Sequence, residues 1–467
     1  MKSISDIFNG YINVGEDSFA YSFSDYYVTL LPAHDDSTAR REIYERLRSR
    51  GEVASEFLYG NDDNKEIAML CKGRIHTSYM GLQLKSSFFT PLVVQAYSNT
   101  YEFFKNLSID WTQFHAITFW GGSLNAIYNP QIAVEKEEAT NDPSNGAREI
   151  KVRPWDDYTR KVDVVIDGEP ATLTVSVMQD PGMHDKDQMG AYNLGLLNSF
   201  VRLAFDNPQN FGQIERCYVI VKKLVALLTG QNNIHLNLYL SQRNSDGLFE
   251  KSAICKVHEP YDNFSNRRWH EVISIYNIFE CLPNLVQKIA NNDADILVNL
   301  LPDNNKQARY VSISNVQDLC TALEVTYRWS DRHSEEDQLI NELKKDIKKT
   351  IKEFMQQNKG IDVYKETTIT SAFQYLDYTL KTRVVELYNE SKDLVDFIVG
   401  KRGLPQVNDE SIGAFVKLRN GKAHSGTFEW SDSAKIYMPL LAMVYIGLFR
   451  YVKLPEDTTR KVIENFF

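Results

Sequence analysis

The residues best suited to catalysis lie in one short stretch near the C-terminal end of the chain. Arg419 and His424 are separated by four residues, and Asn420 follows the arginine directly. A histidine ring moves protons near neutral pH, and a guanidinium group can bind two oxygens of one phosphate. Cleavage of a phosphodiester needs both proton transfer and stabilisation of developing negative charge. These three residues therefore form the candidate catalytic set.

The elements around this set must bring its two ends together. Ile412, Phe415 and Arg419 recur on one helical face, so we expect a helix over 409–419 with its arginine pointing inward or toward a neighbouring helix. In an unbroken helix, positions five apart diverge by about 140°. Asn420-Gly421 is a strong turn signal, so we predict that the helix ends or kinks there and returns His424 to the side of Arg419.

Residues 419–424 match the pattern Arg-polar-x-x-x-His, which resembles the active-site motif of the HEPN superfamily of helical ribonuclease domains. The segment from Asn315 to Trp329, with Leu-Cys-Thr-Ala-Leu-Glu at 319–324, resembles the opening helix of the HEPN domain in ApeA-type bacterial anti-phage proteins. Those proteins join a β-rich N-terminal domain to a C-terminal HEPN domain. The resemblance covers residues 311–467.

The resemblance implies a metal-independent endoribonuclease that needs no cofactor. Carried over, His424 transfers the proton as the RNA 2′-OH attacks the adjacent phosphate, and the product carries a 2′,3′-cyclic phosphate. Arg419 stabilises the pentacovalent state and Asn420 assists by hydrogen bonding. Glu324 would match an acidic residue that orients the arginine or histidine; an ordinary surface glutamate is the alternative.

The resemblance also implies partners. Family members act as homodimers or higher oligomers in which two motifs converge on one cleft formed through the HEPN helices. Their role is anti-phage defence by abortive infection, with RNA as the substrate and transfer RNA as the family-level candidate. The β-rich half would sense a phage-derived trigger or hold the nuclease silent. A non-catalytic HEPN scaffold that binds RNA or protein is the alternative function.

A second arginine–histidine pair fits the same spacing. Arg328 precedes His333 by five positions, but Trp329 follows this arginine where the family favours a polar residue. The pattern by itself arises by chance in a chain of this size, so its setting must decide. Asn420 and the position before a long apolar helix favour the Arg419–His424 set.

Lysines near the motif and on a predicted helix over 335–357 are candidate RNA-binding residues. Lys417 and Lys422 flank the motif, while Lys345 and Lys348 belong to a lysine stripe at helical spacing. Such a stripe can guide a phosphate backbone. A solvated face paired with neighbouring acidic residues is the alternative explanation for the stripe.

Composition sets limits on these proposals. The chain has 467 residues, 62 acidic and 52 basic, and a formal net charge of −10, so any nucleic-acid contact must be a local patch. The five cysteines are widely spaced and indicate reduced thiols in a cytoplasmic protein. The longest apolar run, 436–449, is too short to cross a membrane. His184 and its acidic neighbours read as a polar turn, so we expect no metal site.

Two halves of different pattern predict an α+β multidomain protein. Residues 1–262 form a β-rich domain with packed helices, marked by alternation at 19–23, 162–177 and 234–240 and by one helix at 214–228 that stops at Gly230. The resemblance implies a sensor or regulatory role for this domain. Residues 263–310 form a helical connector. Residues 311–467 form an all-α, HEPN-like bundle with helices over 314–327, 335–357, 371–398, 409–419 and 431–453 and a short last one after Pro455.

Overall fold

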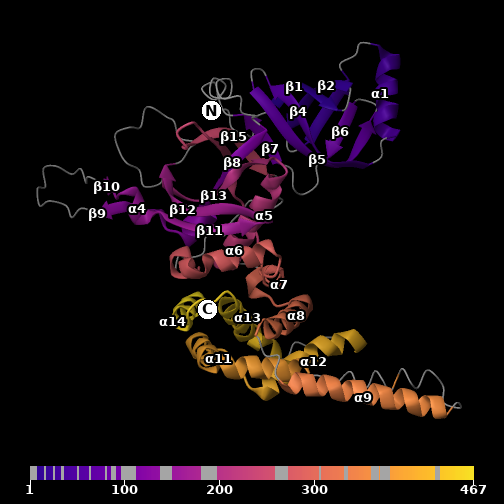
Figure 1. Cartoon of the computed structure of the whole chain (residues 1–467), viewed down its shortest axis with the longest axis vertical. Coiled ribbons are helices and arrows are strands. Elements are labelled where there is room, and N and C mark those ends of the chain that lie inside the picture. The colour runs from indigo at the N-terminus through magenta and orange to yellow at the C-terminus, as the bar shows by residue number, and fades with distance from the viewer. Residues whose placement is uncertain are drawn as a thin grey trace, which may run out of the picture. The chain divides into compact units, whose positions relative to one another are not determined.

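The computed structural model of the chain describes residues 8–14, 17–24, 27–32, 36–49, 52–62, 65–78, 81–85, 91–95, 112–136, 150–179, 197–257, 272–303, 307–330, 335–358, 368, 379–425 and 432–467. The contacts divide the chain into two compact units, Met1–Tyr276 with Leu285–Ala290, and Asn277–Asn284 with Asn291–Phe467. The first holds the strands and the second is helical (Figure 1). The predicted α+β class is therefore confirmed. The functions assigned to 1–262, 263–310 and 311–467 stay predictions.

The first unit is built on a 13-stranded antiparallel sheet of order β11-β12-β13-β8-β14-β15-β7-β5-β4-β1-β2-β3-β6. Its strands are β1 (Phe8–Val14), β2 (Asp17–Ser24), β3 (Tyr27–Pro32), β4 (Glu52–Asp62), β5 (Lys65–Ser78), β6 (Gly81–Lys85), β7 (Pro91–Gln95), β8 (Gln113–Trp120), β11 (Arg160–Ile166), β12 (Glu169–Gln179), β13 (Leu197–Asn210), β14 (Asn237–Arg243) and β15 (Phe249–Val257). A separate pair joins β9 (Val134–Lys136) to β10 (Ile150–Val152).

The helices described beside the sheet are α1 (Ser37–Ser49), α3 (Gly122–Ile127), α4 (Trp155–Tyr158) and α5 (Gln213–Thr229). The α5 helix buries a stripe that includes Tyr218 and Leu224, and the ring of Tyr218 meets Phe119 of β8 edge-on at 6.2 Å. Gly230 ends the helix in the left-handed region at φ 66°, which a residue without a Cβ adopts freely. The predicted helix and its stop are confirmed.

Two of the predicted strand patterns are confirmed and one begins later than expected. Alternating Phe19, Tyr21 and Phe23 are buried on β2. Strands β11 and β12 form the predicted hairpin, with Asp167 and Gly168 both at positive φ in its two-residue turn. Strand β14 begins at Asn237, so the expected start near 234 is three residues early; Ile234 and Leu236 are buried ahead of the strand.

The second unit is a bundle of α8 (Ile313–Trp329), α11 (Leu380–Arg402), α12 (Asp409–Ser425), α13 (Tyr437–Tyr451) and α14 (Glu456–Phe466), together with α7 (Asp295–Val298) and the 3₁₀ helices Ile275–Cys281, Gln307–Arg309 and Asp432–Ile436. The segment α6 (Leu282–Ala290) is shared between the two units. Helices α8, α11 and α13 pack on one another, α12 packs on α8 and α11, and α14 packs on α13 and α11.

The crossing of α8 and α13 is unusually close. A Cβ added at Gly447 of α13 would overlap the Cγ2 methyl of Thr326 on α8. Beyond this point the rings of Trp329 and Tyr451 stack with centroids 5.1 Å apart and planes 3° from parallel. The absence of a side chain at Gly447 therefore sets the separation of the two helices.

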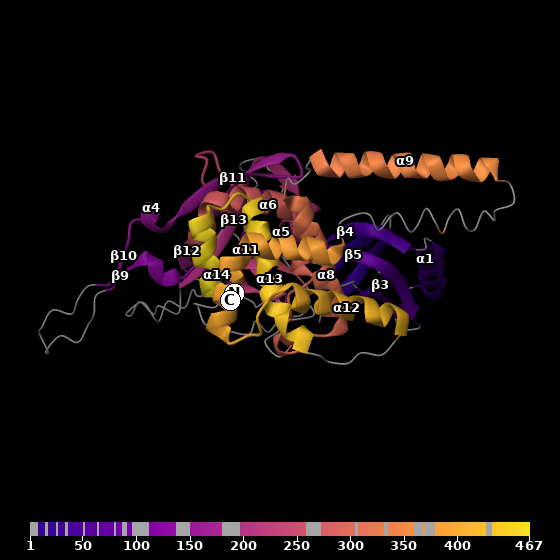
Figure 2. The ribbon, with the colours of Figure 1, turned by 90° about the horizontal axis from the view of Figure 1, so that it is seen from below.

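The long helix α9 (Glu335–Gln357) has the predicted bounds and runs without a break (Figure 2). The helix predicted over 371–398 is described from Leu380 onward as α11, and its predicted start lies outside the described residues. The predicted start of α8 is two residues late, because Ser312 rather than Ser314 is its N-cap and exchanges hydrogen bonds with Asn315.

Candidate functional site

The candidate site is built on the contact between α8 and α12. Buried Ile412 and Phe415 fix one face of α12 against the bundle, and Arg419 continues that face. At the start of α12, Asn408 and Ser411 exchange hydrogen bonds of 2.9 Å between side chain and backbone, which satisfies donors at the helix N-terminus. The first turn of α12 also carries Asp409 and Glu410, whose negative charges interact favourably with the positive N-terminal end of the helix dipole.

Arg419 reaches α8, as its helical face predicts. Its Nη1 donates a hydrogen bond to Oε1 of Glu324 at 3.1 Å, and the two side chains are 34% and 22% exposed. These residues are 95 positions apart in the chain, so only the packing of α12 on α8 brings them together. The pair leaves part of the guanidinium accessible while one carboxylate holds it in place.

A buried thiol lies beside this ion pair. Burial raises the pKa of Cys320, one helical turn before Glu324, to about 12, although the positive charge of Arg419 acts in the opposite direction. Cys320 is therefore protonated at neutral pH and unsuited to act as a nucleophile. The chemistry at this contact rests on the charged pair.

The predicted break in α12 is wrong. The helix runs through Asn420 and Gly421 to Ser425. Asn-Gly favours turns in isolation, but glycine within a helix costs only about 1 kcal/mol relative to alanine, and α12 packs against α8, α11 and the 3₁₀ helix Asp432–Ile436. Positions 419 and 424 therefore diverge by about 140° within one chain. Positions 420 and 424, four apart, lie on one face.

The remaining predicted residues are placed as follows. The side chains of Asn420, Lys422 and His424, and the whole of His333, lie outside the described residues. Lys417 is exposed on α12. Lys345 and Lys348 are exposed on α9, and within the described ranges neither forms an ion pair with an acidic neighbour on that helix. The structure thus brings Glu324 to Arg419 and leaves the α9 lysines on a separate helix.

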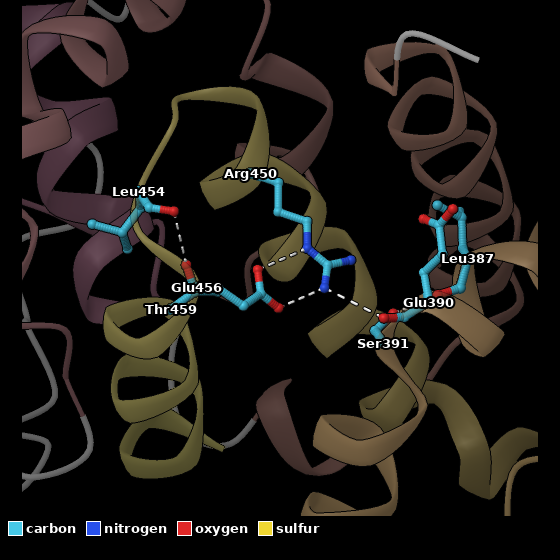
Figure 3. Close-up of polar contacts among 7 residues, drawn as sticks. All are labelled: Leu387, Glu390, Ser391, Arg450, Leu454, Glu456 and Thr459. Atoms are coloured by element: carbon cyan, nitrogen blue, oxygen red, sulfur yellow. Dashed lines mark hydrogen bonds and ion pairs between the residues drawn. The ribbon is translucent and has the colours of Figure 1, made fainter.

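A small pocket lies elsewhere in the helical unit and shares only α8 with the candidate site. It has a volume of about 180 Å³ and is lined by residues of α8, α11 and α13, including Trp329, Leu387, Ser391, Arg450 and Tyr451. Arg450 lies at its edge, where Nε and Nη2 donate to the two carboxylate oxygens of Glu456 at 3.2 and 2.6 Å (Figure 3). A third hydrogen bond runs from Nη2 to the carbonyl oxygen of Glu390 at 3.4 Å.

The sequence did not predict the hydrogen bonds of Arg450 or the contacts between α8 and α11. Tyr327 of α8 donates its hydroxyl to Glu386 of α11 at 2.8 Å, and the guanidinium of Arg383 lies 5.7 Å from the centre of the same ring. The signal available was the position of Arg450 at the end of an apolar helix, just before Pro455 and an acidic turn. Nothing local indicated the α8–α11 contacts.

In the part of the chain that the structure describes, no group of three or more His, Cys, Asp or Glu could hold a metal ion. Among the helices described, none combines the length and apolar character needed to cross a membrane. Comparison with protein-family models, with curated proteins and with solved structures finds no match to this chain.

Proposed function

We propose that the chain is an endoribonuclease of the HEPN type, resembling the ApeA-type anti-phage proteins, and that it cleaves RNA without a metal ion. The observation that supports this is the Arg419–Glu324 ion pair, which joins the two segments carrying the resemblance, one to the motif and one to the opening helix. A held but partly exposed guanidinium is suited to stabilising negative charge on a phosphate.

In the proposed reaction each residue has one task. His424 takes the proton from the RNA 2′-OH as that oxygen attacks the adjacent phosphorus. Arg419 donates to the equatorial oxygens as charge develops there, and Asn420 donates a further hydrogen bond. The bond between phosphorus and the 5′-oxygen breaks, that oxygen takes a proton from water, and a 2′,3′-cyclic phosphate remains. Glu324 is a positioning residue, because it acts through Arg419.

The unbroken α12 makes a second copy of the chain important. Since positions 419 and 424 diverge on one helix, the proposed cleft takes its arginine and histidine from two motifs that converge in a homodimer. The same geometry supports the alternative function, a scaffold that binds RNA or protein, because a single copy does not gather the catalytic set. Anti-phage defence by abortive infection, with a trigger at the β-rich unit, is the proposed setting.

The decisive experiment is cleavage of a mixed cellular RNA pool in EDTA. We expect wild-type protein to cut and to leave cyclic phosphate ends, and His424→Ala to be inactive. His115→Ala, a histidine substitution on β8 of the other unit, is the matched control and should cut like wild type. Equal cutting by His424→Ala would refute the site, and a DNA strand of the same sequence should stay intact.

The role of Glu324 is tested by a readout that a loss of folding would not mimic. Glu324→Gln keeps a hydrogen-bond acceptor but removes the charge, so we expect slower cleavage at unchanged melting temperature and unchanged RNA affinity. If inactive protein proves to be dimeric and still binds RNA, the scaffold function replaces the enzymatic one.

A further inference from the structure

The face of the large sheet opposite α5 carries an unusual set of side chains. Phe119 of β8 contacts α5 through Tyr218, and side chains alternate along a strand, so Thr118 and Trp120 lie on the other face. Strand register places Arg202 and Tyr239 on either side of Thr118 in one row across β13, β8 and β14. This row and its neighbours are termed the aromatic face.

Arg202 of β13 extends its guanidinium over two rings of the aromatic face. Its guanidinium carbon lies 5.2 Å from the centre of the Phe200 ring and 5.5 Å from that of Phe249. Its Nε donates to Thr118 Oγ1 at 3.0 Å, and Nη2 donates to Tyr239 Oη at 3.4 Å. Guanidinium has five N–H donors, so this fixed cation keeps donors for an anion. Over the described ranges, no carboxylate lies within ion-pair distance of the Arg202 guanidinium.

Two further cations lie over rings of the same face. Lys251 Nζ is 5.3 Å from the centre of the Tyr239 ring, and the guanidinium carbon of Arg243 is 5.3 Å from that of Phe249. Trp120 and Tyr239 lie together with ring centroids 5.5 Å apart. Trp120, Arg202, Phe249 and Lys251 are all half-buried, so each keeps an accessible part.

The set spans the four adjacent strands β13, β8, β14 and β15. Neighbouring strands are about 4.8 Å apart, so the backbones of these four strands span about 14 Å. A stacked nucleic-acid strand advances about 3.4 Å per nucleotide, so this length suits several nucleotides rather than one. Cations that track a backbone, together with rings on which bases stack, are the features of single-strand binding surfaces.

From this arrangement we infer that the aromatic face binds single-stranded nucleic acid. Phosphates contact Arg202 and Lys251, and a base stacks at Trp120. The surface is local, as it must be in a chain of net charge −10. It lies in the first unit, on strands that carry none of the residues proposed to cut RNA.

The test is equilibrium binding of a fluorescent single-stranded oligothymidine of about 12 nucleotides to the full chain in EDTA. DNA lacks the 2′-OH, so the probe survives whether or not the chain is a nuclease, and the two proposals fail separately. We expect binding that weakens with rising salt, and a Lys251→Gln variant whose salt slope is smaller by about one. Trp120→Leu should bind about 5- to 150-fold more weakly.

Lys223→Gln on α5 is the matched control, since it removes one charge from the same unit on the other side of the sheet, and it should bind like wild type. Melting curves identify variants that fail to fold. If Trp120→Leu fails to fold, Lys251→Gln still tests the inference. No binding by wild type, or full binding by folded Lys251→Gln and Trp120→Leu, would overturn the inference. Loss of binding only in Lys348→Gln would also overturn it and would assign the strand to α9.

Discussion

Two arginine–glutamate pairs of the helical unit have nearly equal exposure and very different bonding. The side chains of Arg419 and Arg450 are 34% and 35% exposed. Arg450 donates to both oxygens of Glu456 and to a backbone carbonyl, and its carboxylate partner is six residues away in the chain. Arg419 donates to one oxygen of Glu324, which is 95 residues away.

The difference separates a structural arginine from one available for chemistry. The guanidinium of Arg450 donates to both carboxylate oxygens of Glu456 and to the Glu390 carbonyl, so these bonds join the end of α13 to α14 and α11. Within the described residues, Arg419 has a single carboxylate contact that orients it and leaves most of its donors for another anion. Equal exposure therefore says less about function than the number of donors already used.

The largest effect should distinguish the two arginines in catalysis. We expect Arg419→Ala to lower the rate of the proposed RNA cleavage by about 10²- to 10³-fold, because it removes the donor proposed to stabilise the developing charge. Arg450→Ala should change that rate by less than about 3-fold, since the Arg450 guanidinium already donates to the Glu456 carboxylate. Gel assays on the same RNA pool measure both rates. Similar losses in the two variants would remove the distinction.

The α8–α13 crossing leaves no room for a side chain at Gly447, so overpacking it should be costly. Gly447→Ala places a methyl against Thr326 Cγ2, and we expect a loss of about 1–3 kcal/mol in the free energy of unfolding. Denaturant titration measures this loss. Thr326→Ser removes the methyl but keeps the hydroxyl bond to the Ala322 carbonyl, so the double variant should recover most of the stability. No recovery would mean that the strain lies elsewhere.

A smaller effect should be a difference between the two arginines in their contribution to the free energy of unfolding. Arg450→Ala loses three hydrogen bonds and should lower the free energy of unfolding by about 1 kcal/mol, a figure reduced by solvent screening at this exposure. Arg419→Ala loses one and should lower it by less. The same denaturant titration gives both values. A larger loss for Arg419→Ala would assign the Glu324 pair a structural role.

The smallest effect is a pH dependence carried by Glu456. Hydrogen bonds from Arg450 lower the pKa of this carboxyl below its ordinary value of 4.5, against a partial opposing effect of burial. Its stabilising contribution is therefore present above pH 4.5 and is lost as the pH falls through the lowered value. Because Glu456 is 61% exposed, we expect less than about 1 kcal/mol.

Melting temperatures of wild type and Glu456→Gln between pH 7 and pH 3 measure this contribution. The two curves should approach one another below pH 4.5. A difference that stays constant down to the lowest pH would show that the Arg450–Glu456 ion pair contributes nothing to stability.

The sequence predicted elements whose causes are local. The turn Asp167-Gly168 and the stop at Gly230 are both positions of positive φ, which these residue types favour. The bounds of α9 follow from its own pattern. The Asn420-Gly421 signal failed because packing of α12 outweighs a propensity of about 1 kcal/mol. The shift of the α8 cap from Ser314 to Ser312 is an error of two residues between similar caps.

The site was predictable only in part. The helical face of Arg419 indicated a neighbouring helix, and the family resemblance named Glu324, but no spacing argument joins residues 95 positions apart. The aromatic face was not predicted, because Arg202, Thr118 and Tyr239 belong to three strands whose register depends on the folded sheet. The three hydrogen bonds of Arg450 likewise depend on how α11 packs against α13.

The pairing of β7 with β15 bears on how the protein is made. These neighbours in the sheet end at residues 95 and 257, so during synthesis β7 can pair with β5 at once, but its second partner β15 is produced 162 residues later. The 162 residues from the end of β15 to Arg419 take about 8–32 s to add at ordinary elongation rates. Every strand of the large sheet is therefore synthesised before α12, the helix that carries Arg419.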